Sequence, residues 1–113
     1  MQQNVSLPHH KLLAWHAAVA LLVAVRKAQI RDATLRDHAM RSAKSACLNT
    51  AEGAGRVTRA DKARAFGIAR AEAVEAAAAV EIALLSGDVQ AEAARQVPVC
   101  ADRVVALRTG LIR

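Results

Sequence analysis

Residues 66–83 read FGIARAEAVEAAAAVEIA, and their apolar side chains recur at the spacing of an α-helix. The steps are three and four residues in strict alternation, through Phe66, Ala69, Ala73, Ala76, Val80 and Ala83. An unbroken apolar seam of this period is the pattern by which helices pack in bundles. The stretch therefore predicts a long helix, over about residues 59–86, with one side in a helical core.

The reverse side of this predicted helix is also partly apolar. Its stripe contains Ile68, Glu72, Glu75, Ala79 and Ile82 at helical spacing. A helix that is apolar on two sides is buried on both of them. Because the first seam already closes the bundle, we expect a neighbouring subunit against the second, with Ile68, Glu72, Ala79 and Ile82 at the interface.

Three further helices are predicted, over about residues 7–29, 35–52 and 88–112. The first is apolar nearly all round between Leu12 and Val25, which indicates burial on more than one side. Small residues form the seam of the second helix and let a partner helix approach closely; they are Ala39, Ala43, Ala46, Thr50 and Gly53. The last helix repeats the period through Val89, Ala93, Val97, Cys100, Val104, Leu107 and Leu111. Pro98 should kink it, because proline removes a backbone hydrogen bond.

Capping residues set the expected helix boundaries. Thr34 with Asp37, and Thr58 with Asp61, have the spacing of capping boxes and predict the starts of the second and third helices. The Gly-Ala-Gly sequence at residues 53–55 is expected to form the turn between these two helices.

Ser86, Gly87 and Asp88 combine a helix stop with a cap for the last helix. No alternating strand pattern of useful length appears, so the expected fold is all-α. We expect an antiparallel up-down-up-down four-helix bundle in one domain over residues 1–113. The 28 alanines bury little area each, so a lone copy should be only marginally stable. This composition also favours a homo-oligomer.

The net charge of +6 is unevenly spread along the chain. Residues 1–70 hold 12 Lys and Arg against four acids, whereas residues 71–113 hold four against six. A basic half of this kind favours a polyanionic partner, of which nucleic acid is the usual example. The alternative is that the basic excess only keeps the chain soluble.

A set of basic residues on the second helix and around the start of the third is the candidate nucleic-acid surface. The set consists of Arg36, Arg41, Lys44, Arg59, Lys62, Arg64 and Arg70. No aromatic residues lie between them, so we expect contacts to the phosphate backbone of RNA or DNA rather than stacking on bases. A solvated face with a few salt bridges is the competing interpretation.

Other chemistry finds no support in the residue pattern. The four histidines and two cysteines lack metal-ligand spacing, and neither serine nor cysteine has a base at a defined position. We therefore expect no enzymatic activity, no metal and no cofactor. The apolar run from Leu12 to Val25 has 14 residues where a membrane span needs about 20. We expect a cytoplasmic protein without a membrane anchor.

Residues 41–56, RSAKSACLNTAEGAGR, resemble the second-helix signature of the 23S rRNA-intervening-sequence four-helix-bundle proteins. The matching positions are Arg41, Ala43, Ser45, Asn49, Ala51, Glu52, Gly53, Gly55 and Arg56. Residues 11–17 look like the opening of the family's first helix, 68–70 with Glu75 like its third, and 110–113 like its C-terminal GLIR.

This resemblance implies a left-handed bundle that commonly assembles as a homopentameric ring. It also implies a relation to the accessory variability protein of diversity-generating retroelements, a basic pentamer that binds a reverse transcriptase and nucleic acid. Asn49, Glu52, Arg56 and Glu75 would then form a structural polar network, with ligand binding as the alternative role. The resulting hypothesis is a small non-enzymatic accessory protein that associates with RNA or DNA; the alternative is a protein-binding scaffold or reverse-transcriptase partner.

Overall fold

Helices account for almost all of the regular structure in the computed structural model, which describes the backbone of residues 5–112 and the side chains of residues 5–107. A short 3₁₀-helix and five α-helices follow one another: η1 (Pro8–Lys11), α1 (Leu13–Ala28), α2 (Ala33–Gly55), α3 (Arg59–Leu85), α4 (Ala91–Ala94) and α5 (Gln96–Ile112). No strand occurs in this part of the chain. The expected all-α fold is confirmed.

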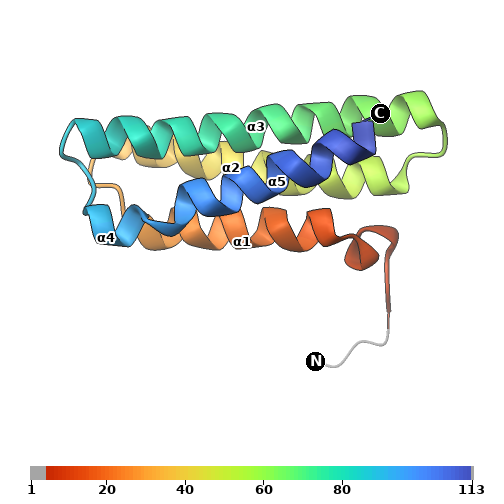
Figure 1. Cartoon of the computed structure of the whole chain (residues 1–113), viewed down its shortest axis with the longest axis horizontal. Helices are drawn as coiled ribbons and strands as arrows, with labels where there is room; N and C mark the ends of the chain where they lie inside the picture. Colours follow the sequence, from red (N-terminus) through yellow and green to blue (C-terminus); the bar gives the residue numbers. More distant parts are fainter. Residues whose placement is uncertain (1–4, 113) are drawn as a thin grey trace.

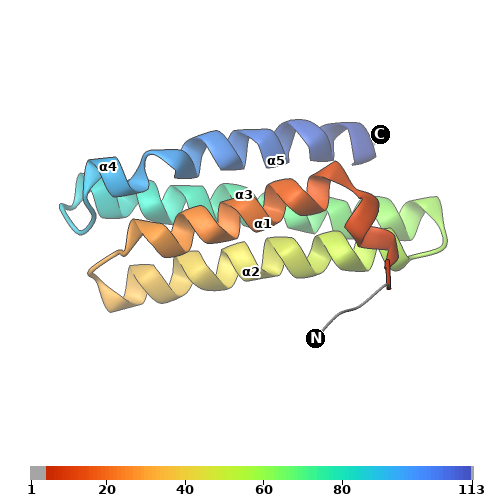
Figure 2. The ribbon, with the colours of Figure 1, turned by 90° about the horizontal axis from the view of Figure 1, so that it is seen from below.

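The four long helices lie side by side, and successive helices run in opposite directions (Figure 1). α2 and α3 form the most extensively packed pair, while α5 lies against both α3 and α1. Figure 2 shows the same arrangement from below, with the tip of the α2–α3 hairpin extending past the ends of α1 and α5. The described residues thus form an antiparallel four-helix bundle.

The core follows the two seams that the sequence predicts on α2 and α3. All of the α2 seam residues are buried, and so are all six of the α3 seam, from Phe66 to Ala83. Most of them are alanines, so the two helices approach closely and gain from dispersion contacts between many small groups. The largest fully buried side chains are Leu21, Ile30, Val97, Val104 and Thr50.

The predicted turn at residues 53–55 is wrong, because α2 continues through it to Gly55. A Cβ atom placed on Gly53 would lie 2.6 Å from Cε1 of Phe66 on α3. The glycine therefore makes room for the ring of Phe66, the only phenylalanine in the chain. The actual turn is residues 56–58.

The start of α2 also differs from the prediction. Asp32, not Thr34, is the cap: its Oδ2 accepts a hydrogen bond from the backbone N–H of Leu35 at 2.9 Å. Aspartate is a preferred residue at this position, and it begins the helix two residues early. The cap of α3 is as predicted, with the Oγ1 of Thr58 accepting from the N–H of Asp61 at 3.1 Å.

The N-terminal boundary of the first helix, expected near residue 7, is displaced to Leu13. Pro8 instead opens a 3₁₀ turn, in which the N–H of Leu7 donates to Nδ1 of His10 at 3.1 Å. The ring of His9 packs edge-on against Trp15 with centroids 4.5 Å apart. These local contacts compete with a regular helix and hold Leu12 in an extended conformation.

The last predicted helix is divided into α4 and α5 at Arg95. Pro98 lies in the first turn of α5, where a missing N–H costs little, and its ring would clash with the carbonyl of Ala94 in a continuous helix. Gly87, with φ +78°, ends the preceding helix, but Asp88 is not the next cap: Gln90 takes that position.

Two further observations concern the ends and the hydropathy of the chain. The side chains of residues 108–113, including Leu111 and the GLIR sequence, lie outside the described part. Among the described residues, every helix is too short or too polar to cross a bilayer.

Candidate nucleic-acid and subunit interface

Four of the seven predicted nucleic-acid-binding residues have exposed side chains that form neither a hydrogen bond nor an ion pair in the described part of the chain: Arg41, Lys44, Arg64 and Arg70. Arg41 and Lys44 lie on the outer side of α2. Arg64 is four residues before Ile68 and shares the flank of α3 that faces α2. These three cations therefore line one side of the molecule.

Arg70 is not part of that side. It is seven residues from Ala77, which lines a hollow between α3 and the α4–α5 segment. By helical spacing, Arg70 shares this second flank of α3 and is separated from Arg64 by the outer face of the helix. The structure does not gather all of the predicted basic residues in one patch.

The side chains of Arg36 and Lys62 make hydrogen bonds that support the fold. Nη1 of Arg36 donates to the carbonyl oxygens of Ile30 at 3.1 Å and Arg31 at 3.4 Å. Nζ of Lys62 donates to those of Gly53 at 3.3 Å and Ala54 at 3.1 Å. A cation at the C-terminus of α2 satisfies carbonyls that lack helical partners and complements the helix dipole. Both residues therefore have a structural role.

Arg59 is exposed at the first position of α3, beside the α2–α3 turn. Val57 in the same turn is 91% exposed, so the tip of the hairpin presents a large apolar side chain next to this arginine. The tip is therefore a separate basic position from the side formed by Arg41, Lys44 and Arg64.

The predicted polar network is divided into separate contacts. Nη2 of Arg56 lies 2.7 Å from Oε2 of Glu52, one helical turn away. This hydrogen bond, together with the charge of Glu52, raises the pKa of Arg56, so the guanidinium stays charged. Nδ2 of Asn49 donates to the carbonyl oxygen of Ser45 at 2.9 Å. Both contacts are internal to this stretch of the chain and do not join α2 to α3.

Glu75 makes the inter-helix contact, but its partner is a histidine. Its Oε2 lies 2.5 Å from Nε2 of His38 on α2, and both side chains are about half exposed. Glu75 therefore does not join Asn49, Glu52 and Arg56 in the predicted polar network. Exposed pairs contribute about 0–1 kcal/mol, so this contact helps to set the register of the two helices more than their stability.

The predicted subunit-interface stripe does not lie opposite the core seam. Ala79 is only 4% exposed, and with Ile82 and Glu75 it lines a hollow of about 200 Å³ that also includes Thr34 and His38 of α2. The stripe is thus the flank of α3 beside α2. Ile68 and Ile82 remain 42% and 52% exposed, and Glu72 is half-buried.

The side of α3 that faces away from the bundle was missed by sequence reasoning. No charged residue occurs along this side, and all its members are exposed or half-buried: Ala60, Gly67, Ala71, Val74, Ala78 and Leu85. We call this set the outer α3 face. The spacing of uncharged residues in the sequence was the available signal, but alanine and glycine give little contrast in hydropathy. Around Gly67 there is open space, with nothing within 4 Å of an added Cβ.

Ion-binding and thiol chemistry have few candidates here. Within the described residues, no three His, Cys, Asp or Glu side chains come together in a way that could hold a metal ion. Cys47 is buried and Cys100 half-buried, and both are in the thiol form.

Comparison with known proteins places this chain in a family. A search of the curated proteins finds no match. The family model described as 23S rRNA-intervening sequence protein matches residues 10–109, which include all four long helices except the last residues of α5. The chain, an all-helical bundle that carries the sequence signature on α2, belongs to the 23S rRNA-intervening sequence protein family.

Proposed function

We propose that this protein is a non-enzymatic, homo-oligomeric accessory protein that associates with the phosphate backbone of RNA or DNA. The observation that carries the proposal is the row of exposed cations on one side, formed by Arg41, Lys44 and Arg64 without carboxylate partners in the described part. Cations of this kind attract phosphates and release counterions from nucleic acid. The family's description, which refers to an intervening sequence of 23S rRNA, supports RNA as the first polymer to test.

The proposed binding mode is weakly sequence-specific. The three side chains belong to two different helices, and each is exposed to solvent. No aromatic side chain accompanies them, since Trp15 lies at the start of α1 and Phe66 is buried in the core. Contacts to phosphates without stacking position a nucleic acid but do not read its sequence.

The test is fluorescence anisotropy of a labelled RNA between about 50 and 200 mM salt. The triple variant Arg41→Gln/Lys44→Gln/Arg64→Gln should weaken binding roughly tenfold or more at the low salt and flatten the salt dependence. The matched control, Arg70→Gln/Arg95→Gln/Arg103→Gln, removes the same formal charge from other surfaces and should bind nearly as tightly as the natural chain. Negligible binding by the natural chain at every salt concentration would refute the proposal.

A second candidate function is a protein-binding scaffold, and the outer α3 face favours it. An uncharged strip along a 27-residue helix is unusual on a surface that faces only water. Glycine in a helix interior costs about 1 kcal/mol relative to alanine, and Gly67 has no neighbour in this chain that requires it. A second copy packed against this face would require a small residue there. Contacts of this kind would assemble copies of the chain into a homo-oligomer, such as a pentameric ring. A reverse transcriptase is the other partner proposed for this face.

The oligomer test uses light scattering coupled to size-exclusion chromatography. Val74→Arg introduces a charge in the middle of the outer α3 face and should reduce the oligomer to smaller species. Gln90→Arg, a matched charge addition at an exposed site before α4, should leave the mass unchanged. A natural chain that is monomeric at high micromolar concentration would exclude the assembly.

A further inference from the structure

The connection between α1 and α2 forms an open hollow that neither proposed surface includes. The hollow has a volume of about 570 Å³ and is lined by Arg26, Gln29, Ile30, Arg31 and Arg36. Three of these five residues are arginines. They come from the last turn of α1, from the connection itself and from the first turn of α2.

Two of the arginines are held in place by neutral hydrogen-bond acceptors. The guanidinium of Arg31 donates to the carbonyl oxygen of Gly87, and that of Arg36 donates to the carbonyl oxygens of Ile30 and Arg31. Carbonyl groups orient a guanidinium without neutralising its charge. Each guanidinium has five N–H donors, so both retain donors that these contacts do not use.

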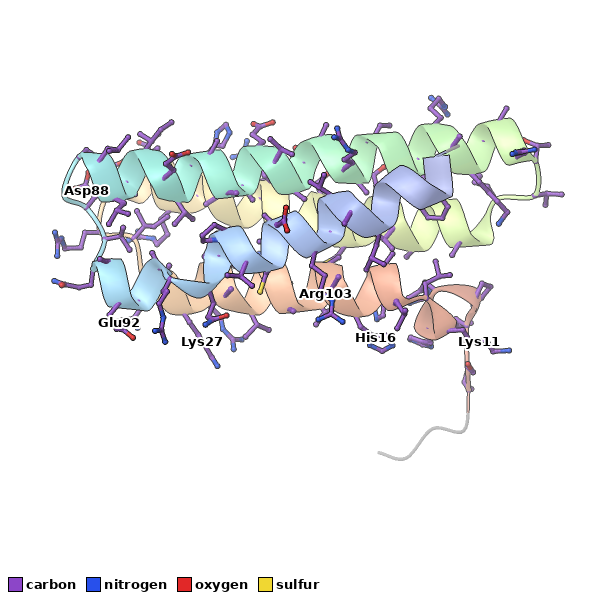
Figure 3. The ribbon with its side chains drawn as sticks, viewed as in Figure 1. Lys11, His16, Lys27, Asp88, Glu92 and Arg103 are labelled. Atoms are coloured by element: carbon purple, nitrogen blue, oxygen red, sulfur yellow. The ribbon has the colours of Figure 1, made fainter. Side chains whose placement is uncertain are left out.

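The carboxylates of Asp32 and Asp88, the acids whose backbones adjoin Arg31, form no ion pair with the arginines of the hollow. Oδ2 of Asp32 accepts from the N–H of Leu35 at 2.9 Å, and Oδ2 of Asp88 accepts from the hydroxyl of Ser86 at 2.9 Å. Among the described residues, none of the three arginines forms an ion pair. Lys27 lies at the same end of the bundle as Asp88 (Figure 3) and adds another positive charge.

The backbone of the connection also has a costly conformation at this place. Gln29 is the one non-glycine residue with a positive φ in the described part, at 54°. A glycine would adopt this left-handed conformation more readily, but it would lack the amide that Gln29 contributes to the lining. Gln29 is the C-cap of α1, so its left-handed conformation ends the helix and begins the connection that carries Arg31.

We propose that this hollow, which we call the elbow site, binds a phosphate group. The pre-oriented guanidinium groups of Arg31 and Arg36, the exposed guanidinium of Arg26 and the amide of Gln29 provide donors from several directions. This arrangement fits the tetrahedral oxygens of a phosphate better than the planar oxygens of a carboxylate. Bound phosphate would relieve the repulsion between three like charges.

The phosphate group has two sources, a free phosphate ion or the backbone of a nucleic acid. The second source rests on the proposed function, whereas the first does not. Binding of inorganic phosphate therefore tests the elbow site by itself, and competition by RNA tells the sources apart.

The experiment is equilibrium dialysis of the full chain against radiolabelled inorganic phosphate at constant ionic strength. The natural chain should show saturable binding, and Arg26→Gln should weaken it about threefold to tenfold. The side chain of Arg26 makes no hydrogen bond or ion pair in the described part, and its backbone carbonyl, which accepts from the N–H of Gln29, is unchanged by the substitution, so the variant should remain folded by circular dichroism. Arg41→Gln removes one charge on the outer side of α2 and should change the phosphate affinity less than twofold.

Absence of saturable phosphate binding, or equal losses in Arg26→Gln and Arg41→Gln, would overturn the inference. In a second arm, a short RNA is added to the phosphate-loaded chain. Displacement of phosphate supports a nucleic-acid source, and retention of phosphate supports a free phosphate group. If phosphate binds at the elbow site but RNA binds nowhere on the chain, the site stands and the proposed function fails.

Discussion

At the scale of single residues, Gly53 shows how much depends on one missing methyl group. It is buried in α2, and an added Cβ would overlap the ring of Phe66 on α3. Because the ring is itself only 4% exposed, it has little room to move away. The packing of Phe66 against α2 therefore depends on the absence of a side chain at residue 53.

We expect Gly53→Ala to lower the free energy of unfolding by about 1–3 kcal/mol, since overpacking outweighs the better helix propensity of alanine. Chemical denaturation measures the change. Gly55→Ala is the matched control: an added Cβ has nothing within 4 Å, so stability should stay equal or rise. An equally stable Gly53→Ala chain would contradict the overlap.

Cys100 provides a pH-dependent prediction. Burial raises the pKa of its thiol above the ordinary value of 9.0, and the charge of Arg103 offsets part of that increase. Below pH 9 the thiol is protonated in both folded and unfolded chains, and its contribution to stability is complete. Above pH 9 the unfolded chain loses the proton first, so the stability of the natural chain falls as the pH rises.

The variant Cys100→Ala has no thiol at residue 100, so it should not show this decrease in stability above pH 9. The free energy of unfolding, measured by denaturation from about pH 8 to pH 10.5, should therefore fall less steeply for the variant than for the natural chain. If the free energies of unfolding of the two chains change in parallel with pH, the thiol does not contribute to the pH dependence of stability.

At the scale of elements, the break between α4 and α5 follows from Pro98. A continuous helix through Arg95 would place the proline ring against the carbonyl oxygen of Ala94. Val97 and Ala94 are nonetheless buried, so the packing of both helices persists across the break. The chain thus changes direction without losing its core contacts.

We expect Pro98→Ala to join the two helices while changing stability by about 1 kcal/mol or less, because lost rigidity of the unfolded chain offsets the added backbone hydrogen bond. Hydrogen exchange of the amides of residues 95–98 measures the effect, with slower exchange in the variant. Unchanged exchange would show that packing, and not the proline, causes the break.

The elements also show which parts of the structure are predictable. The seam from Phe66 to Ala83 follows from its period alone, since the alternation of three and four residues has one structural meaning. Gly53 was misread because a glycine that ends a helix and one that permits close packing look the same in a sequence. Two features depend on how α1, α2 and α3 are aligned with one another. One is the contact between Glu75 and His38, and the other is the clustering of Arg26, Arg31 and Arg36 at the elbow site. Local pattern does not contain that information.

At the scale of the whole molecule, the bundle is flattened, with its shortest extent about half of its longest. Its radius of gyration is 14.3 Å and its extents are 44 × 36 × 21 Å, whereas a compact chain of this length has a radius of gyration of about 13 Å. A flattened bundle exposes more surface for the core that it encloses, and this core consists mainly of alanine. A single copy should be marginally stable.

If the outer α3 face packs against another copy, assembly adds to that stability by mass action. The melting temperature should then rise by several degrees between low and high micromolar protein concentration, as differential scanning calorimetry can measure. Val74→Arg, which disrupts the proposed contact, should remove the concentration dependence. A melting temperature that is constant for the natural chain would argue against assembly.

Arg31 connects two loops at one end of the bundle, with its backbone N–H donating to the carbonyl oxygen of Asp88 at 2.8 Å and its guanidinium donating to that of Gly87. The peptide bond between Gly87 and Asp88 is therefore flanked by non-covalent contacts to the same residue. The opposite end of the bundle holds both η1 and the end of α5 (Figure 1). The fold should therefore not require an intact peptide bond between Gly87 and Asp88. We expect a circular permutant that begins at Asp88, with the natural ends joined by a flexible linker, to fold into the same bundle.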